Sequence, residues 1–223
     1  MDRLRVGIVI PALNEAATIS QVVRAASDYG TCFVVNDGST DDTAERATAA
    51  GAVVVSHAMN RGYDAALNSG FRSASDCGCD VIVTLDADGQ HDPQRVQQLL
   101  DAIQAGAFVA LGVRHQRARW AEHVFSWFTR WRWGIVDPLC GLKAYRTEVY
   151  RALGHFDAYQ SIGTELMLFA ARQHLLIHQI PFTVRERLDQ PRFGRRVSAN
   201  WRILRALLGA VWHGHPSERN ATC

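Results

Sequence analysis

Residues 6–15 read VGIVIPALNE, and this stretch decides the fold. Its first five residues, Val6–Ile10, form a continuous apolar run that ends at Pro11. Such a run is typical of a strand that is buried on both faces of a parallel sheet. Apolar residues then recur at helical spacing through residues 16–28. The sequence therefore predicts a buried strand followed directly by a helix.

The alternation of strand and helix continues to about residue 112. Further strands are predicted at Cys32–Val35, Val53–Val55, Val81–Leu85 and Phe108–Gly112. Helices are predicted over residues 41–50 and 62–75, and after Asp92, which would cap a helix with Pro93 at its first position. Alternating elements with short connections predict an α/β fold with a Rossmann-like, mostly parallel sheet flanked by helices.

The second half is less regular. Helices are predicted over residues 119–133, 164–174 and 199–212, and a strand at Leu176–Pro181. We expect one domain over residues 1–215, with a nucleotide-binding half at 1–110, an acceptor-binding half at 111–215 and a frayed tail at 216–223.

The helix predicted over residues 119–133 carries a stripe of large apolar side chains: Trp120, Val124, Trp127, Phe128 and Trp131. Two interpretations stay open for this stripe. It contacts a membrane surface, with nearby arginines meeting anionic headgroups, or it packs on the sheet. The helix over residues 199–212 has the same ambiguity.

Composition excludes several classes of protein. The 223 residues are 48% apolar and 21% charged, as in globular domains, and no apolar run approaches the length that crosses a bilayer. The five cysteines have no zinc-ligand spacing. Because the N-terminus resembles a strand rather than a signal peptide, we expect a cytoplasmic protein with reduced thiols.

Charge is uneven along the chain. The first 110 residues hold 14 acidic and 7 basic side chains, and residues 111–223 hold 8 acidic and 17 basic ones. Lys143 is the only lysine, so the basic groups are otherwise arginines, whose planar fork of donors suits phosphate. We expect a cation in the acidic half and phosphate groups in the basic half. Nucleic acid is not an expected partner, because the basic residues form no recognisable motif.

The densest chemical cluster follows the strand at Val81–Leu85 and reads DADGQHDP from Asp86 to Pro93. Alternation along an extended segment points Asp86 and Asp88 to the same side. Two close carboxylates favour a cation between them, and oxygen ligands suit Mg²⁺ or Mn²⁺. Gln90 would add a carbonyl oxygen and His91 an imidazole. The alternative, a solvated turn that only caps the next helix, suits Asp92 but not two aspartates delivered by a buried strand.

Four motifs occur in order: PALNE at 11–15, VNDGSTDD at 35–42, NRGYDAALNSG at 60–70 and DADGQHDP at 86–93. Together they resemble the inverting glycosyltransferases of family 2, which have a GT-A fold. Among these the chain is most similar to the dolichyl- and polyprenyl-phosphate sugar synthases. The resemblance covers about residues 5–205 and is most specific over the first 95.

The resemblance implies a site for a UDP- or GDP-linked sugar. The residues along the nucleotide would be Pro11, Ala12, Asn14 and Glu15, with Glu15 near the ribose, Asp37 at the base, and Asn60, Arg61 and Gly62 beside them. Gly38-Ser39 is expected to be a simple turn, and Asp64 stands where the family usually has a second glycine. By the same resemblance Asp86, Asp88 and Gln90 would hold the metal and the donor diphosphate, with Asp88 catalytic.

The resemblance also implies an acceptor site in the second half. The segment Asp137–Arg146 resembles a family motif whose serine helps to hold the acceptor phosphate, and Cys140 occupies the serine position. Arg114 and Arg130 are further candidates for that phosphate. Glu165 lies where many members have an acidic residue near the acceptor. The basic residues Arg187 and Arg192 match a family loop that closes over the diphosphate, and Arg192 would offset the charge of the leaving group.

The sequence thus predicts a metal-dependent transferase that moves a sugar from a nucleotide sugar to an acceptor. The acceptor expected from the resemblance is a polyprenyl phosphate at the cytoplasmic membrane face, reached through peripheral membrane contact or a membrane partner subunit. Two alternatives stay open: a glycosyltransferase that acts on a soluble hydroxyl acceptor, and a non-catalytic subunit that binds a nucleotide sugar.

Overall fold

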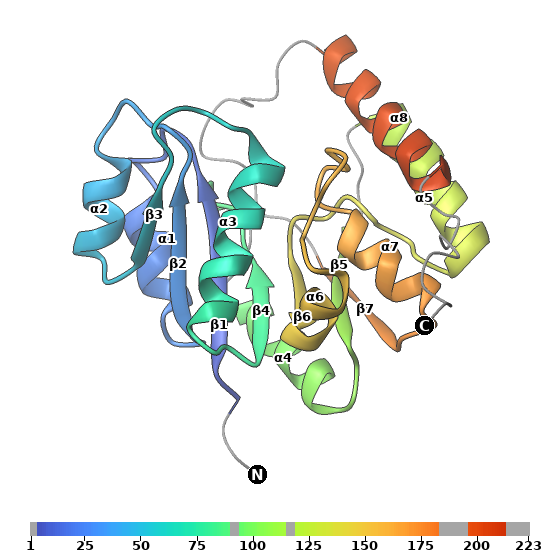
Figure 1. Ribbon diagram of the computed structural model, residues 1–223, viewed down its shortest axis with the longest axis horizontal. Coiled ribbons are helices and arrows are strands. Elements are labelled where there is room, and N and C mark those ends of the chain that lie inside the picture. The colour runs from blue at the N-terminus through green and yellow to red at the C-terminus, as the bar shows by residue number, and fades with distance from the viewer. Residues whose placement is uncertain (1–3, 90–93, 115–118, 183–195, 213–223) are drawn as a thin grey trace, which may run out of the picture.

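A single mixed sheet organises the chain (Figure 1). The computed structural model describes residues 4–89, 94–114, 119–182 and 196–212. Its seven strands lie in the order β3-β2-β1-β4-β6-β5-β7. They are β1 (Val6–Ala12), β2 (Thr31–Asn36), β3 (Val53–Ser56), β4 (Val81–Thr84), β5 (Val109–Arg114), β6 (Lys143–Arg146) and β7 (Ile177–Phe182). The predicted α/β class with a mostly parallel, helix-flanked sheet is confirmed.

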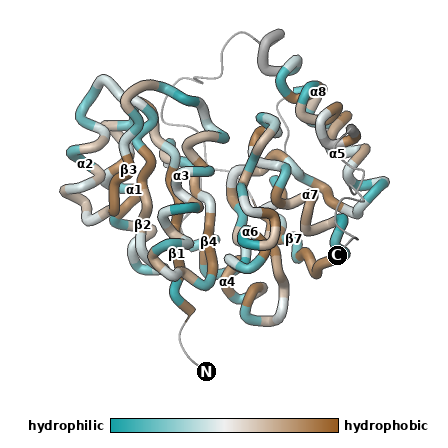
Figure 2. The backbone as a smooth tube through the Cα atoms, in the orientation of Figure 1, coloured by the Kyte–Doolittle hydropathy of each residue, from teal (hydrophilic) through white to brown (hydrophobic). Residues whose placement is uncertain are grey.

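The apolar run of β1 is central to the sheet, between β2 and β4 and parallel to both. Its side chains alternate between two cores: Ile8 and Ile10 belong to one buried cluster and Val9 to the other. Because both faces of the strand are covered, apolar residues are favoured at every position of the run. Figure 2 shows this hydrophobic centre along β1, β2 and β4.

Helices cover both faces of the sheet. The first cluster packs α1 (Ile19–Ala26), α2 (Thr43–Ala49) and α4 (Gln94–Gln104) on one face. The second packs α3 (Tyr63–Asp76), α5 (Trp120–Trp133), α6 (Thr147–Leu153), α7 (Glu165–Arg172) and α8 (Arg196–Trp212) on the other. Most predicted elements end within three residues of these bounds; the predicted cap at Asp92 and the tail at 216–223 lie outside the described residues.

The strand order reverses between β1 and β4. The chain passes from β1 outward to β2 and β3, and α3 then carries it back across to β4 on the other side of β1. In open α/β sheets such a reversal leaves a crevice beyond the carboxyl ends of the strands, where ligands bind. The motifs at 11–15, 36–42 and 86–89 all follow carboxyl ends at this reversal.

Strand β6 and helix α6 are absent from the sequence predictions. β6 lies between β4 and β5 and runs antiparallel to both. It has only four residues, KAYR, of which Ala144 and Tyr145 are fully buried. A short run that begins with a lysine and ends with an arginine carries no apolar signature, although its position between two strands buries its centre.

Helices α5 and α8 lie side by side at one edge of the molecule (Figure 1). The predicted stripe of α5 faces outward: Trp120 is 57% exposed, Trp127 69% and Trp131 73%. The interpretation that this stripe packs on the sheet is therefore wrong, since Ala121, Phe125 and Thr129 form the buried face instead. Trp201, Leu208 and Val211 of α8 are also exposed. Within the described ranges, no helix combines the length and the apolar character that crossing a bilayer requires.

Candidate active site

Asp86 and Asp88 follow β4 at the reversal of strand order. Ala87 between them is 4% exposed, whereas both aspartates are partly accessible. Residues 87–88 form a turn in which Ala87 is buried and its two aspartate neighbours are partly accessible, and a shared direction of their side chains stays a prediction. The Tyr63 hydroxyl donates to Asp86 Oδ1 at 3.4 Å. Two accessible carboxylates on one turn suit a divalent cation that takes its other ligands from phosphate and water.

Gly141, just before β6, makes room for the Asp86 carboxylate. A Cβ atom at residue 141 would lie 2.3 Å from Asp86 Oδ2, far inside van der Waals contact. The space is needed by the aspartate, so the glycine is required there for its size. Gln90 and His91, the other predicted ligands, lie outside the described residues. Within the part of the chain that is described, no third His, Cys, Asp or Glu joins the two aspartates in a metal-binding group.

The PALNE loop and the NDGST turn hold each other. Asn14 has a left-handed backbone (φ 52°), which asparagine tolerates better than most residues. Its backbone N–H donates to Ser39 Oγ at 2.9 Å, and its side-chain Oδ1 accepts from Thr40 N at 2.8 Å. Ser39 is thus more than the simple turn residue that the sequence predicts, because it fixes the loop that follows β1.

Gly38 also has a specific role. Its φ is +75°, and a Cβ there would lie 2.6 Å from Asn60 N. The turn after β2 therefore packs directly on the backbone of the Asn60 segment, which no larger residue would permit.

Glu15 lies at the start of the route from β1 to α1 and is buried, with 9% of its surface exposed. Its backbone N–H donates to Thr43 Oγ1 at 2.8 Å. Thr18 Oγ1 lies 3.2 Å from Glu15 Oε2 and donates to Ala87 O at 2.7 Å. Glu15 is therefore linked to the turn between Asp86 and Asp88. Pro11 and Ala12 end β1 beside Val35 and Asn36 of β2, and their contact with a nucleotide stays a prediction.

Asp37 organises the segment that contains Asn60, Arg61 and Gly62. Its carboxylate is buried and accepts hydrogen bonds from Arg61 N at 2.9 Å and Gly62 N at 2.8 Å. His57 Nδ1 lies 2.7 Å from Asp37 Oδ1, and its Nε2 lies 2.9 Å from Ser69 Oγ. A contact between Asp37 and a nucleotide base stays a prediction. His57 was not predicted, because a lone histidine carries no motif, and Ser69 was quoted within the motif at 60–70 without a role.

Arg114 at the end of β5 is held by two carboxylates. Its guanidinium donates to Asp137 through Nε at 2.8 Å and Nη2 at 2.9 Å, and Nη2 also donates to Glu122 Oε2 at 3.3 Å. Burial alone would lower the pKa of Arg114, but the hydrogen bonds and charge of Asp137, together with Glu122, raise it above its ordinary value. The interaction joins the first turn of α5 to the end of the sheet. A contact with acceptor phosphate stays a prediction for this residue.

Cys140, which stands at the family's serine position, and the candidate Arg130 differ in their surroundings. Cys140 is fully buried, and burial followed by the charge of Asp137 raises the pKa of its thiol to about 12. A buried, neutral thiol is a poor phosphate ligand. Arg130 is exposed in the last turn of α5, about 12 Å along the helix from Glu122. Arg187 and Arg192 of the predicted basic loop lie outside the described residues.

Glu165 begins α7 and anchors the preceding loop, residues 154–164. Its carboxylate accepts from Ala158 N and lies 2.9 Å from His155 Nε2. The same loop is bonded to α3: Gly163 N donates to Asp64 Oδ1 at 2.8 Å, and Asn68 Nδ2 donates to Asp157 O at 2.7 Å. Sequence reasoning missed this arrangement, although the departure at Asp64 from the family glycine was a signal.

Lys143, the first residue of β6, also contacts this loop. It is 3% exposed, and its Nζ donates to Gly163 O at 2.6 Å. Burial lowers the pKa of Lys143 to about 8, while burial and the nearby charge of Asp157 raise the pKa of Asp64 to about 6. The two groups moderate each other, since the charge of each favours the charged form of the other.

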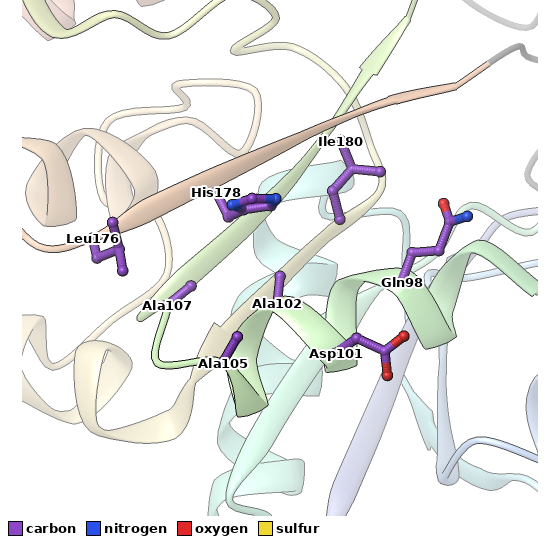
Figure 3. Close-up of a pocket in the computed structure, with 8 residues that line it drawn as sticks. All are labelled: Gln98, Asp101, Ala102, Ala105, Ala107, Leu176, His178 and Ile180. Carbon is purple, nitrogen blue, oxygen red and sulfur yellow. The ribbon is translucent and has the colours of Figure 1, made fainter.

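Two shallow pockets open at the amino ends of the strands. One, of about 380 Å³, lies between α4 and β7 and is lined by Ala102, Ala107, His178 and Ile180 among others (Figure 3). The other lies beside Leu4 and Tyr29. Both are at the opposite end of the sheet from Asp86 and Asp88, so neither is part of the candidate active site.

Comparisons with known proteins agree with this geometry. The profile described as "Glycosyl transferase family 2" matches residues 7–165. An undecaprenyl-phosphate mannosyltransferase from Micrococcus luteus is 29% identical over 92% of this chain and 100% of its own. A polyprenol monophosphomannose synthase from Mycolicibacterium smegmatis is 31% identical over 81% of this chain and 77% of its own.

A solved structure is also similar. It is the glucosyl-3-phosphoglycerate synthase of Mycobacterium tuberculosis in complex with Mn²⁺ and UDP-glucose. It has a TM-score of 0.75 and 26% identity, and the match covers 96% of this chain and 81% of the other. The likeness assigns the GT-A fold to the sheet and its helices.

Proposed function

The chain belongs to glycosyltransferase family 2, and we propose that it is a metal-dependent inverting enzyme that transfers a sugar from a nucleotide sugar to a polyprenyl phosphate. The observation that carries the proposal is the pair Asp86 and Asp88, both partly accessible in the turn after β4 and next to the reversal of strand order. An acidic pair in this position matches the need of a donor diphosphate for a bridging cation.

The donor lies across three loops that are already bonded to one another. Asn14 is fixed by Ser39, and the Asn60–Gly62 segment is fixed by Asp37. The nucleoside occupies the edge formed by these loops, and the diphosphate extends toward Asp86 and Asp88. Fixed loops lower the entropy that donor binding would otherwise cost.

Asp86 and Asp88 fit Mg²⁺ or Mn²⁺, because two partly accessible carboxylates stand two residues apart in one turn and Gly141 leaves room for Asp86. When bound, the cation neutralises charge on the departing diphosphate. Asp88 would hold the donor diphosphate by way of that cation, and Tyr63 fixes Asp86 through its hydroxyl. Arg192 offsets leaving-group charge from the basic segment that contains it.

In the transfer step, an acceptor oxygen attacks the anomeric carbon from the face opposite the diphosphate. The new oxygen–carbon bond forms as the bond from that carbon to the diphosphate oxygen breaks, and a nucleoside diphosphate leaves. An ionised acceptor phosphate needs no proton removed. Glu165 is therefore not needed as a base, and its two carboxylate oxygens are already engaged by His155 and Ala158 N.

Support for a lipid acceptor comes from the outward face of α5 and α8. We call it the tryptophan face, and it consists of Trp120, Val124, Trp127, Trp131, Trp201, Leu208 and Val211. Exposed arginines accompany it, namely Arg130, Arg132, Arg202 and Arg205. The acidic residue of these two helices is Glu122, which is 4% exposed. Helices that lie on anionic membranes typically combine an apolar face that carries tryptophan with arginines on the polar side of the helix.

The membrane contact is tested by sedimentation with vesicles of phosphatidylglycerol and phosphatidylcholine. Binding to anionic vesicles should fall at least about tenfold in a Trp127→Ser, Trp131→Ser variant, since each change removes a large apolar contact. The matched control is Leu176→Ser, an exposed apolar residue just before β7. The membrane contact would be contradicted if the wild-type chain does not sediment with anionic vesicles, or if these tryptophans are buried in a dimer.

The transfer itself is tested with UDP-glucose and GDP-mannose, Mn²⁺ and undecaprenyl phosphate in detergent. Asp88→Ala should lower turnover by about 10³-fold and leave the unfolding temperature nearly unchanged. Asp101→Ala, an exposed aspartate on α4, is the control. Wild-type turnover in Asp88→Ala with metal present would refute the assignment. Product with phosphoglycerate alone would favour a soluble acceptor, and donor binding without turnover would favour a non-catalytic subunit.

A further inference from the structure

The first turn of α3 touches three separate parts of the site through three successive residues. Gly62 N donates to Asp37 at 2.8 Å, in the segment proposed to bind the nucleotide. The Tyr63 hydroxyl lies 3.4 Å from Asp86 Oδ1. Asp64 Oδ1 accepts from Gly163 N at 2.8 Å, in the loop before Glu165. A shift of this turn on donor binding would therefore reach all three parts at once.

Asp64 and Asn68 are four residues apart, so they lie on the same face of α3. Asn68 holds the beginning of the 154–164 loop: its Oδ1 accepts from Phe156 N at 2.9 Å and Asp157 N at 3.3 Å, and its Nδ2 donates to Asp157 O. Asp64 holds the end of the loop at Gly163. The helix thus grips the loop at both ends through backbone groups.

The loop needs this external support. Gln160 (φ 58°) and Ile162 (φ 57°) both have left-handed backbones, and Ile162 is β-branched. Such residues persist only when the surrounding structure fixes them. Within the loop, Asp157 accepts from Ser161 N, and Ser161 Oγ in turn accepts from the N–H groups of Thr164 and Glu165. The grip at Asp64 and Asn68 therefore sets the conformation that leads into α7.

We propose that Asp64 and Asn68 are positioning residues that couple the donor segment to the acceptor loop. This inference rests on the proposed function, in which residues 60–62 meet the donor and the region before Glu165 meets the acceptor. Donor binding tightens the first turn of α3, and Asp64 and Asn68 transmit that order to the loop. By thermodynamic linkage, acceptor binding then strengthens donor binding by the same factor.

Two measurements test the coupling. Hydrogen exchange of residues 154–164 is followed with and without UDP-glucose or GDP-mannose and Mn²⁺. Acceptor KM is measured with undecaprenyl phosphate in detergent, and donor Kd is measured in the absence of acceptor. In the wild type, donor should slow exchange in the loop. In Asp64→Ala and Asn68→Ala this response should be lost and acceptor KM should rise about tenfold, while donor Kd changes less than about twofold.

Further variants separate positioning from general damage. Asp64→Asn keeps an oxygen acceptor for Gly163 N and should restore acceptor KM to near the wild-type value. Asp76→Ala, an exposed aspartate at the end of the same helix, should behave as the wild type. The double variant D64A/N68A should cost less than the sum of the single changes, because both act on one loop. If Asp64→Ala does not fold, Asn68→Ala and Asp64→Asn carry the comparison.

The outcomes are distinguishable from failure of the proposed function. No donor binding by the wild type would sink the proposed function itself. The coupling would be overturned, and the proposed function would stand, if the wild type binds donor and transfers sugar but two further results are found. These are hydrogen exchange in the loop that does not respond to donor, and an unchanged acceptor KM in Asp64→Ala or Asn68→Ala.

Discussion

The loops after β1, β2 and β4 use their polar side chains differently from the region around β5, β6 and the 154–164 loop. In the first region, Asp37 and Asn14 hold backbone amides, and Asp86 and Asp88 remain on the accessible side. In the second, charges satisfy one another or are buried, as Arg114 does with Asp137 and Lys143 with Gly163 O. The proposed donor edge is thus held by bonds between its loops, whereas the proposed acceptor side owes its shape to internal pairing.

The largest expected effect breaks the first region at Gly141. Asp86 occupies the space that a methyl group would fill, so Gly141→Ala should displace the carboxylate. We expect kcat/KM to fall about 10³-fold, close to 4 kcal/mol in the barrier, because small misplacements at a reacting centre are costly. Steady-state kinetics with Mn²⁺ measure this. The effects of Gly141→Ala and Asp86→Ala on kcat/KM should not be additive. Full activity in Gly141→Ala would contradict the role of Gly141 in making room for Asp86.

The next effect is on stability and concerns the second region. Arg114→Ala would leave Asp137 and Glu122, which are 1% and 4% exposed, without their shared cation. We expect a loss of about 3 kcal/mol in the free energy of unfolding, measured with urea. Arg130→Ala, at an exposed position, should change it by less than about 0.5 kcal/mol. Equal effects of the two changes would mean that the ion pair is not structural.

The smallest effect is a pH dependence at Asp64. Burial raises its pKa from 3.8 to about 6, so its contribution to stability is fully present below pH 4 and is lost as pH rises through 6. Asp64→Asn does not titrate. The unfolding temperature of Asp64→Asn relative to the wild type should therefore increase between pH 4 and pH 7. A difference in unfolding temperature that does not change between pH 4 and pH 7 would show that burial does not raise the pKa of Asp64.

The sequence predicted the first region well and the second poorly, for physical reasons. Buried parallel strands such as Val6–Ile10 carry a continuous apolar signature. Turns such as Asn36–Ser39 carry the residue types that turn backbones favour. The roles assigned to individual site residues there stay predictions. By contrast, β6 is four residues long and polar at its ends, and the hydrogen bond from Gly163 to Asp64 joins residues 99 apart. Such pairings follow from tertiary packing and leave no local pattern.

The tryptophan face shows a different limit. Periodicity correctly placed Trp120, Trp127 and Trp131 on one side of α5, but it could not tell which side meets the sheet. The opposite side carries Ala121, Phe125 and Thr129. The small side chains of Ala121 and Thr129 allow close packing against neighbouring elements. The buried Glu122 bonded to Arg114 fixes that orientation.

The burial of Lys143 has a chemical consequence. It is the only lysine in the chain, and its amine is shielded by the loop whose carbonyl it meets. Burial lowers the pKa of Lys143 to about 8 while the loop covers the amine, and an exposed amine returns toward the ordinary pKa of lysine. Acylating reagents should therefore modify Lys143 only when the loop moves away from it. The rate of labelling at Lys143 would then report how often the loop opens.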